Sequence, residues 1–183
     1  GVLDQLDRYP DRENVMVGIE DNRQYCCCPD CAAMMQKYGN SAAASVIKCV
    51  NHIAAEVEEH LAGTGRTVRV VMFAYYGYLD APVTQTADGT FAPIDDTVVL
   101  ADNAGVMIAP IDSDYAHSYY ETDYNTAERR AFQQWTALTD SIYLWTYTTN
   151  FSYMLTPYDA FNAMQENFQF FKEHNVKYFY AQG

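Results

Sequence analysis

The chain has 183 residues, of which 49% are hydrophobic and 19% are charged. This length suits one ordinary domain with its own core, and the composition excludes a disordered or low-complexity chain. The 11 Lys and Arg residues against 24 Asp and Glu residues give a net charge of −13, which disfavours binding to nucleic acid or to an anionic membrane surface. No apolar run approaches the roughly 20 residues that a membrane span needs. We therefore expect a single acidic domain over residues 1–183, with no nucleic-acid partner and no membrane insertion.

Five short apolar runs along the chain predict strands. They lie at residues 15–20, 68–76, 106–111, 142–147 and 176–180. Continuous apolar runs are typical of strands buried on both faces, and these runs alternate with segments of helical periodicity. The strand starts recur at about 35 to 55 residues, a spacing that suits strand–helix units in a parallel sheet. The sequence therefore predicts an α/β fold with parallel strands.

The segments between these strands carry helix signals. Pro29 suits the first turn of a short helix that ends at Gly39, and Ser41 is a natural N-cap for a longer helix whose apolar face runs from Val46 to Leu61. Residues 77–105 show no helical period apart from turn signals such as Asp88-Gly89, so we expect a long loop there. Loops of this length in a compact domain are usually functional or fold over a site.

Two further helices are expected in the second half of the chain. Asn125 and Glu128 have the spacing of a capping box, ahead of an apolar stripe at Phe132, Trp135 and Leu138. The last helix is predicted to begin at Asp159. Its predicted buried face consists of Phe161, Met164, Phe168 and Phe171.

The order of these elements favours a barrel-like sheet. Five parallel strands after the close of a helix, with Leu3 and Leu6 ahead of Pro10, fit the later part of a TIM-type (β/α) barrel, so we expect a fragment of a larger barrel protein. An open doubly wound sheet is the alternative. Such a sheet normally has a glycine-rich phosphate loop after its first strand, whereas Ile19 is followed here by Glu-Asp-Asn-Arg.

Polar and aromatic side chains gather where the predicted strands end. In a parallel barrel these ends meet on one side, where the site lies. Two carboxylates beside aromatic rings suit glycoside hydrolysis, because one protonates the leaving oxygen while the other attacks or activates water. The candidate catalytic residues are Asp21, Glu20 and Asp112, and the candidate substrate-binding residues are Tyr75, Tyr76, Asp114, Trp145, Tyr147 and Asn150. Any one of these acids would equally well end a strand or cap a helix, so the hypothesis depends on their recurrence at four strand ends.

Four of the five cysteines lie within six positions, at Cys26, Cys27, Cys28 and Cys31. Three of them with His52 would make a zinc ligand set, but a second CxxC is missing, so a local disulfide or free thiols is the simpler interpretation. We expect this cluster to be a structural brace in the loop or first helical turn after the first strand, with no metal and no cofactor. Cys49 is expected to be a buried small apolar residue, and His117 is the one histidine expected near the cleft.

The order of several short motifs resembles a known family. These motifs are Asp21-Asn22 at a strand end, CxCxxC from Cys26 to Cys31, Val50-Asn51-His52-Ile53-Ala54, Phe73-Ala74-Tyr75, Ile108-Ala109-Pro110-Ile111-Asp112, Leu144-Trp145-Thr146-Tyr147 with Asn150-Phe151, and Val176-Lys177-Tyr178-Phe179. Together they resemble a bacterial family of domains of unknown function that is grouped with the glycoside hydrolase barrels. Thr146 stands where the family pattern has Asp, and Gln182 stands where Glu is common.

The resemblance implies a carbohydrate ligand and a role in carbohydrate metabolism. It also implies an extracytoplasmic or secreted location as part of a longer chain, although the first residues show no signal-peptide pattern. Three interpretations stay open. The first is hydrolysis of glycosidic bonds by paired carboxylates, the second is a non-catalytic carbohydrate-binding or scaffold domain, and the third is a cysteine-coordinated metal module that docks proteins.

Overall fold

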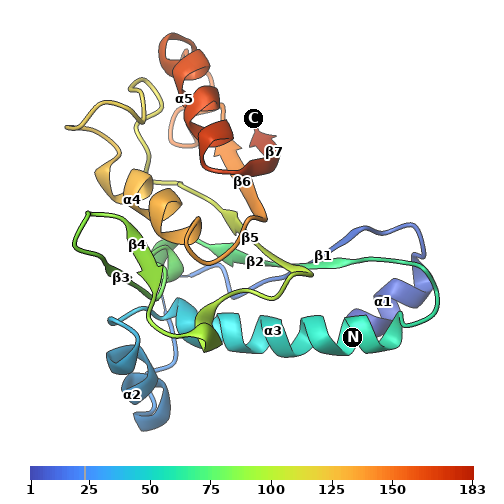
Figure 1. Cartoon of the computed structure of the whole chain (residues 1–183). Helices are drawn as coiled ribbons and strands as arrows, with labels where there is room; N and C mark the ends of the chain where they lie inside the picture. Colours follow the sequence, from blue (N-terminus) through green and yellow to red (C-terminus); the bar gives the residue numbers. More distant parts are fainter. Residues whose placement is uncertain (23) are drawn as a thin grey trace.

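The main feature of the computed structural model, which describes residues 1–22 and 24–183, is a five-stranded sheet with the order β1-β2-β5-β6-β7. Its strands are β1 (Asn14–Val17), β2 (Arg69–Ala74), β5 (Ala104–Ile108), β6 (Ile142–Tyr147) and β7 (Val176–Gln182). Every neighbouring pair is parallel, which confirms the predicted strands and their direction. The sheet curls into a half-barrel flanked by helices, a shape compatible with part of a (β/α) barrel (Figure 1).

Five α-helices lie along the described part of the chain, before and between these strands. They are α1 (Val2–Arg8), α2 (Pro29–Lys37), α3 (Ala43–His60), α4 (Thr126–Trp135) and α5 (Phe161–Glu173). Figure 1 shows α3 running alongside β1 and β2, with α4 and α5 at the other end of the sheet near β6 and β7. Across residues 1–22 and 24–183, the longest helices are too short or too polar to cross a membrane.

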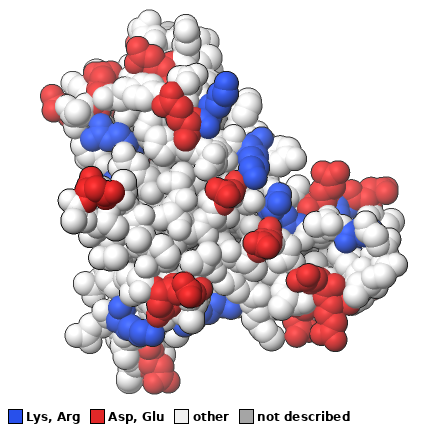
Figure 2. Space-filling view, in the orientation of Figure 1, with Lys and Arg blue, Asp and Glu red and all other residues white. Residues whose placement is uncertain are grey.

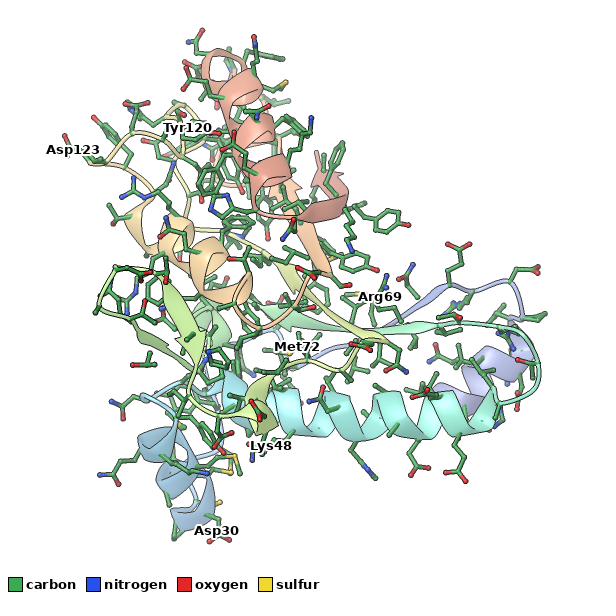
Figure 3. All side chains as sticks on the ribbon, in the orientation of Figure 1. Asp30, Lys48, Arg69, Met72, Tyr120 and Asp123 are labelled. Carbon is green, nitrogen blue, oxygen red and sulfur yellow. The ribbon has the colours of Figure 1, made fainter. Side chains whose placement is uncertain are left out.

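The core lies on the helix-covered, outer face of the sheet. Alternate strand residues point to this face, and Met72, Ile108 and Leu144 are each 0% exposed. They share one cluster with Ile47 and Val50 of α3, and Figure 3 shows Met72 between the sheet and this helix. The predicted apolar face of the long helix is therefore confirmed. Close packing on this face holds the strands in the register that brings their carboxyl ends together.

The stripe predicted for α4 is also confirmed. Phe132, Trp135 and Leu138 are buried, and the Trp135 indole Nε1 donates a hydrogen bond to the Leu79 carbonyl at 2.8 Å. The predicted capping box at its start is wrong. Asn125 has a left-handed backbone with φ of 51°, and its side chain makes no cap hydrogen bond.

The Asn125 side chain instead ties down the preceding loop. Its Oδ1 accepts a hydrogen bond from the Asp114 amide at 2.7 Å, and its Nδ2 donates to the Asp114 carbonyl at 2.9 Å. Asparagine tolerates the left-handed region because its short polar side chain bonds nearby backbone, as it does here. The residue thus closes a loop rather than capping a helix.

The buried face predicted for α5 is wrong in part. Phe161 is 80% exposed and Phe168 is 40% exposed, while Ala163, Asn167 and Phe170 are buried. Asn167 faces inward because its Oδ1 accepts a hydrogen bond from the Tyr119 amide at 2.9 Å. Phe171 is buried as predicted, so the buried face is shifted only in part from the one that hydrophobicity alone favours.

Residues 77–105 are more structured than expected. They contain two 3₁₀ turns, η1 (Tyr76–Tyr78) and η2 (Asp96–Val98), and a hairpin of β3 (Val83–Gln85) and β4 (Phe91–Pro93). The predicted turn at Asp88-Gly89 closes this hairpin, with Asp88 Oδ1 accepting from the Thr90 amide at 3.1 Å and Gly89 at φ of 88°. Strands of three residues are too short to show a two-residue alternation of apolar and polar side chains. The hairpin was therefore not predicted from the sequence.

Charged side chains are scattered over the face shown in Figure 2, including near its middle. Acidic groups lie both at its border and nearer its centre, and the Lys and Arg groups are scattered among them without forming a continuous basic surface. The excess of Asp and Glu in the sequence is thus visible on this face as separate acidic groups rather than as a single patch.

Candidate functional site

A cleft of about 440 Å³ opens at the carboxyl ends of the parallel strands. Each strand of the large sheet provides wall residues, either from its own end or from the residues that follow it. They are Ile19 and Asp21 after β1, Phe73, Tyr75 and Tyr76 from β2 and beyond, Ala109 and Ile111 after β5, Trp145, Tyr147 and Phe151 from β6 and beyond, and Gln182 of β7. This is the position at which barrel enzymes and doubly wound proteins place their ligands.

The alternation of the strands explains why these side chains meet. In β6, Leu144 faces the helices, whereas Trp145 and Tyr147 face the concave side of the sheet. The parallel register then places Trp145 beside Tyr180, and Tyr147 beside Gln182. Side chains of one parity from neighbouring strands therefore form a continuous concave surface.

Aromatic rings form most of this surface. The Phe73 ring lies 5.8 Å from Trp145 and 6.0 Å from Tyr75, and the Tyr75 and Tyr76 rings are 4.9 Å apart. The Trp145 Nε1 donates a hydrogen bond to Gln182 Oε1 at 2.9 Å, which fixes the indole orientation. None of these rings is fully buried, so each keeps part of its surface available to a ligand.

Tyr76 is held in an unusual backbone conformation, with φ of 48°. A bulky residue in the left-handed region is uncommon and costs of order 1 kcal/mol or more. Tyr76 is also the first residue of η1 and lines the cleft. Such strain is characteristic of binding sites, and here it turns the chain sharply away from β2 at the cleft wall.

Asp21 provides a carboxylate on the cleft wall. The Tyr75 hydroxyl donates to the Glu20 carbonyl at 3.2 Å, and it lies 3.4 Å from Asp21 Oδ1. Burial, followed by the negative charge of Asp21, raises the pKa of Tyr75. Burial likewise raises the pKa of Tyr147 to about 12, with smaller contributions from Tyr76 and Asp21. Both hydroxyls therefore stay protonated at neutral pH and can donate hydrogen bonds.

The structure brings five of the nine candidate residues together. Asp21, Tyr75, Tyr76, Trp145 and Tyr147 all line the cleft. The other four follow strand ends without forming its walls: they are Glu20, Asp112, Asp114 and Asn150. Their roles in catalysis or binding stay predictions.

Three of these four residues have local partners of the kind that turns provide. Glu20 Oε2 accepts from the Asn22 side chain at 3.3 Å, Asp114 Oδ1 accepts from the Ala116 amide at 3.1 Å, and Asn150 Oδ1 accepts from the Ser152 amide at 2.9 Å. The negative charge of Asp112 also contributes to raising the pKa of Tyr147, after burial and other neighbours. Asp112 therefore lies close enough to act electrostatically on a cleft residue.

Several wall residues were not predicted. Phe73 and Gln182 have the same strand parity as Tyr75 and Tyr180, so the two-residue period of their strands would have identified them. Phe151 lies outside any strand, and its ring reaches Tyr147 at 5.7 Å through a loop that has no periodic signal.

His117 lies outside the cleft walls, contrary to expectation. Its ring stacks on Tyr124 at 3.5 Å with an interplanar angle of 3°, and its Nδ1 lies 3.2 Å from Glu121 Oε2. The histidine thus organises the loop before α4.

The comparisons with known proteins identify a family. The whole of residues 1–183 matches the model of one protein family, a domain of unknown function, DUF4838. The chain belongs to the DUF4838 family. No curated protein and no solved structure matches it. Membership in the DUF4838 family confirms the predicted resemblance to a domain of unknown function, and the activity has to be inferred from the cleft itself.

The cysteines of this DUF4838 family member lie where they were predicted. Cys26, Cys27 and Cys28 are in the loop after β1, Cys31 is in the first turn of α2, and all are free thiols. Cys49 is exposed on α3, so its predicted burial is wrong: it falls on the solvent side of the helix, next to the buried Val50.

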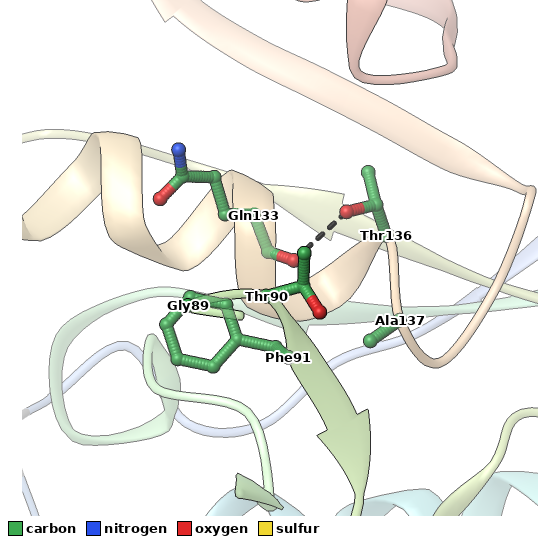
Figure 4. Close-up of a pocket in the computed structure, with 6 residues that line it drawn as sticks. All are labelled: Gly89, Thr90, Phe91, Gln133, Thr136 and Ala137. Atoms are coloured by element: carbon green, nitrogen blue, oxygen red, sulfur yellow. Dashed lines mark hydrogen bonds between the residues drawn. The ribbon is translucent and has the colours of Figure 1, made fainter. Parts of the chain in front are cut away.

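A second hollow, of about 330 Å³, lies between the β3–β4 hairpin and the end of α4 (Figure 4). Its walls include Thr90, Phe91, Gln133 and Thr136, and the Thr136 hydroxyl donates to the Gln133 carbonyl at 2.8 Å. Its lining contains no charged side chain and no aromatic residue besides Phe91. The strand-end cleft is therefore the better candidate for chemistry.

Proposed function

We propose that the strand-end cleft binds a saccharide. The observation that carries this proposal is the partly exposed row of aromatic rings, with Trp145 and Phe73 at its centre, beside the carboxylate of Asp21. Sugars present apolar C–H faces that pack against such rings and hydroxyls that need polar partners. The cleft volume of about 440 Å³ falls within the range of small-ligand sites.

The polar groups of the cleft suit sugar hydroxyls. Asp21 accepts hydrogen bonds, while the Tyr75 and Tyr147 hydroxyls can donate, because both are protonated at neutral pH and burial raises the pKa of both still further. A charged acceptor makes hydrogen bonds roughly twice as strong as a neutral one does. The cleft thus combines a stacking surface with donors and an acceptor that fix the orientation of a polar ring.

Binding is favoured over hydrolysis by the number of carboxylates. Asp21 is the one acid among the described residues that line the cleft, whereas glycoside hydrolysis usually needs two. Gln182, which occupies the cleft where the resembling family commonly has Glu, cannot act as a general acid or base. Hydrolysis is the second candidate, favoured by the influence of Asp112 as well as Asp21 on Tyr147.

The binding proposal is tested with the purified chain on an array of neutral and acidic oligosaccharides, followed by calorimetry with the best ligand. Trp145→Ala should weaken binding at least about tenfold, because each well-placed aromatic contact contributes of order 1 kcal/mol in addition to its buried area. Tyr9→Ala is the matched control, since Tyr9 is a 48% exposed aromatic residue after α1. Absence of binding, or equal effects of the two variants, would refute the proposal.

Hydrolysis is tested separately by measuring the release of reducing ends from the bound oligosaccharide. If the cleft is catalytic, Asp21→Asn and Asp112→Asn should each reduce turnover at least about 100-fold, the effect expected of a general acid or base. Binding without release of reducing ends would leave the binding function intact and exclude the catalytic one.

We also propose that the half-barrel is the later part of a larger TIM-type barrel. The support comes from β7, the last strand of the sheet, where Tyr178, Phe179 and Tyr180 are 53%, 57% and 51% exposed. An exposed aromatic edge strand tends to pair with further strands. The 183-residue chain alone should therefore self-associate in light scattering, and Phe179→Lys should reduce this association. A monodisperse monomer would contradict the proposal.

A further inference from the structure

The cysteine cluster beside α2 is a second chemical site, separate from the cleft. The Sγ atoms of Cys26, Cys28 and Cys31 all lie within 4.8 Å of one another, although all three are free thiols. Three sulfur ligands of a tetrahedral zinc ion, each about 2.3 Å from the metal, lie about 3.8 Å apart. The three thiols are therefore already gathered nearly as closely as a metal would hold them.

The local backbone prepares these thiols for a metal. Cys28 is the N-cap of α2, Pro29 follows in the first turn, and the Ala32 amide donates to the Cys28 carbonyl at 2.9 Å. This geometry places Cys28 at the start of α2 and Cys31 within its first turn, so both thiols project from the same helix end. Thiolates are the metal-binding form of cysteine, and a helix N-terminus favours them.

The loop that carries the first two cysteines is held in place by an aromatic contact. Tyr25 packs edge-on against Tyr78 of η1, with 6.2 Å between ring centroids. A Cβ at Gly77 would lie 3.0 Å from the Tyr25 ring, so the residue between the two η1 tyrosines has to be small. Because η1 also contains the cleft residue Tyr76, the cysteine loop and the cleft are joined through the same turn.

We propose that Cys26, Cys28 and Cys31 bind one Zn²⁺ ion and that a water molecule completes its tetrahedral coordination. Within residues 1–22 and 24–183, no carboxylate or histidine adds a ligand atom to this group, and His52 stands apart from it. The Cys27 thiol donates toward the Tyr25 carbonyl at 3.4 Å, so this thiol already has a backbone partner. Figure 3 shows sulfur atoms next to α2, the helix on which Asp30 is labelled.

The ion would brace the segment between the cleft and α2. Each thiol loses its proton to solvent on binding, so affinity rises with pH, and no oxidant or reductant is required. A disulfide would join two of these sulfurs and leave the third without a role. The convergence of all three explains the CxCxxC spacing more completely than a single CxxC pair does.

The test begins with the chain purified under reducing conditions, and the metal content is measured by mass spectrometry. The apo chain is then titrated with Co²⁺, whose visible bands report tetrahedral geometry and whose thiolate charge-transfer intensity reports the number of sulfur ligands. We expect one equivalent of zinc, three thiolates per cobalt, and displacement of Co²⁺ by Zn²⁺.

Variants then assign the ligands. Cys26→Ser, Cys28→Ser and Cys31→Ser should each weaken metal affinity more than about tenfold. Cys27→Ser, in the same loop, and Cys49→Ser, exposed on α3, are matched controls that should bind as the parent chain does. Circular dichroism checks that each variant folds, and the parent spectrum alone gives the ligand count if a variant does not.

Three results would overturn the proposal. They are a reduced parent chain that neither retains zinc nor binds Co²⁺, a Cys27→Ser variant that loses the metal as fully as Cys28→Ser does, and a cobalt spectrum without thiolate charge transfer. None of these measurements involves a saccharide, so the outcome is independent of the function proposed for the cleft.

Discussion

The two faces of the half-barrel sheet come from alternate residues of the same strands, yet their chemistry differs. The outer face of β6 presents Ile142 and Leu144, both 0% exposed beneath the helices, whereas its concave face presents Tyr143, Trp145 and Tyr147. A sheet buried equally on both faces would be aliphatic on both. Aromatic residues with polar atoms on one face indicate that this face contacts something more polar than a helix.

The concave face also differs between its two ends. At the amino ends of the strands, the Tyr143 hydroxyl donates to Asn14 Oδ1 at 2.6 Å and accepts from Arg69 Nη1 at 3.4 Å, so the side chains bind one another. Figure 3 shows Arg69 at this end of β2. At the carboxyl ends, the rings of Trp145 and its neighbours leave an open cleft. The amino end is therefore structural, and the carboxyl end is available to a ligand.

The sharpest test of the two-face comparison uses adjacent residues of β6. Leu144→Ala should reduce the free energy of unfolding by about 2–5 kcal/mol, because it leaves a cavity in the closely packed outer core. Trp145→Phe keeps a ring and loses the bond to Gln182, so its cost should be only about 1 kcal/mol. Urea unfolding of both variants measures the difference. Equal losses would show that the concave face is as much a part of the core as the outer face.

The structural role of the amino end of the concave face is tested at Gly105. A Cβ on this residue would lie 2.8 Å from the Ser141 carbonyl oxygen, 3.0 Å from the Tyr143 ring and 3.2 Å from Arg69. Because the first of these atoms is backbone, just before the neighbouring strand β6, Gly105→Ala should cost about 1–3 kcal/mol of stability.

Gly18→Ala is the control for this substitution, since a Cβ there would meet nothing within 4 Å. Thermal unfolding compares the two variants. An unchanged unfolding midpoint for Gly105→Ala would mean that β5 and β6 can move apart with little loss of stability. The amino end of the concave face would then not have the structural role described above.

The contrast between the two faces of the sheet also explains which elements could be predicted from the sequence. Five parallel strands were predictable because the outer face and the strand centres give continuous apolar runs, and Trp145 and Tyr147 were recognisable as polar aromatics at a strand end. The α5 face was predictable only in part, because Asn167 turns inward to bind the amide of Tyr119, 48 residues earlier. Such contacts depend on tertiary structure and leave no local periodicity.

The candidate site divides in the same way. Asp21 and Tyr75 were predictable from their places after two strands, and the structure joins them at 3.4 Å. Glu20, Asp114 and Asn150 have the same residue types and positions, but they bond to nearby groups instead. Composition at a strand end does not distinguish a cleft residue from a turn residue, because both need polar side chains where the strand stops.

On the helix-covered side, polar groups are structural, and Asp95 provides a pH-dependent test. Hydrogen bonds from Thr97, followed by contacts with Lys37 and Tyr38, hold the pKa of Asp95 well below its usual value of 3.8. A lowered pKa in the folded state stabilises the protein above the unfolded value, and this contribution is lost as the pH falls below about 4. The parent chain should therefore lose more thermal stability between pH 5 and about pH 3 than Asp95→Asn does.

Asp96→Asn is the matched control, because Asp96 is the exposed neighbour in η2. The measurement is the unfolding midpoint across the acid range for the parent and the two variants. If Asp95→Asn follows the parent curve and Asp96→Asn does not, the acid sensitivity of this side arises from another carboxylate.

The smallest expected effect concerns a single hydroxyl in the cleft. Tyr75→Phe keeps the ring that packs 4.9 Å from Tyr76 and removes the oxygen that lies between Glu20 and Asp21. If that hydroxyl positions Asp21 for a saccharide, binding should weaken by about 0.5–1.5 kcal/mol, which is roughly a 2- to 12-fold rise in Kd. Calorimetry of Tyr75→Phe, Asp21→Asn and the double variant separates the contributions. The losses should be less than additive, because both changes break the same hydrogen bond. Strict additivity would mean that Tyr75 contacts the ligand directly and leaves Asp21 to act alone.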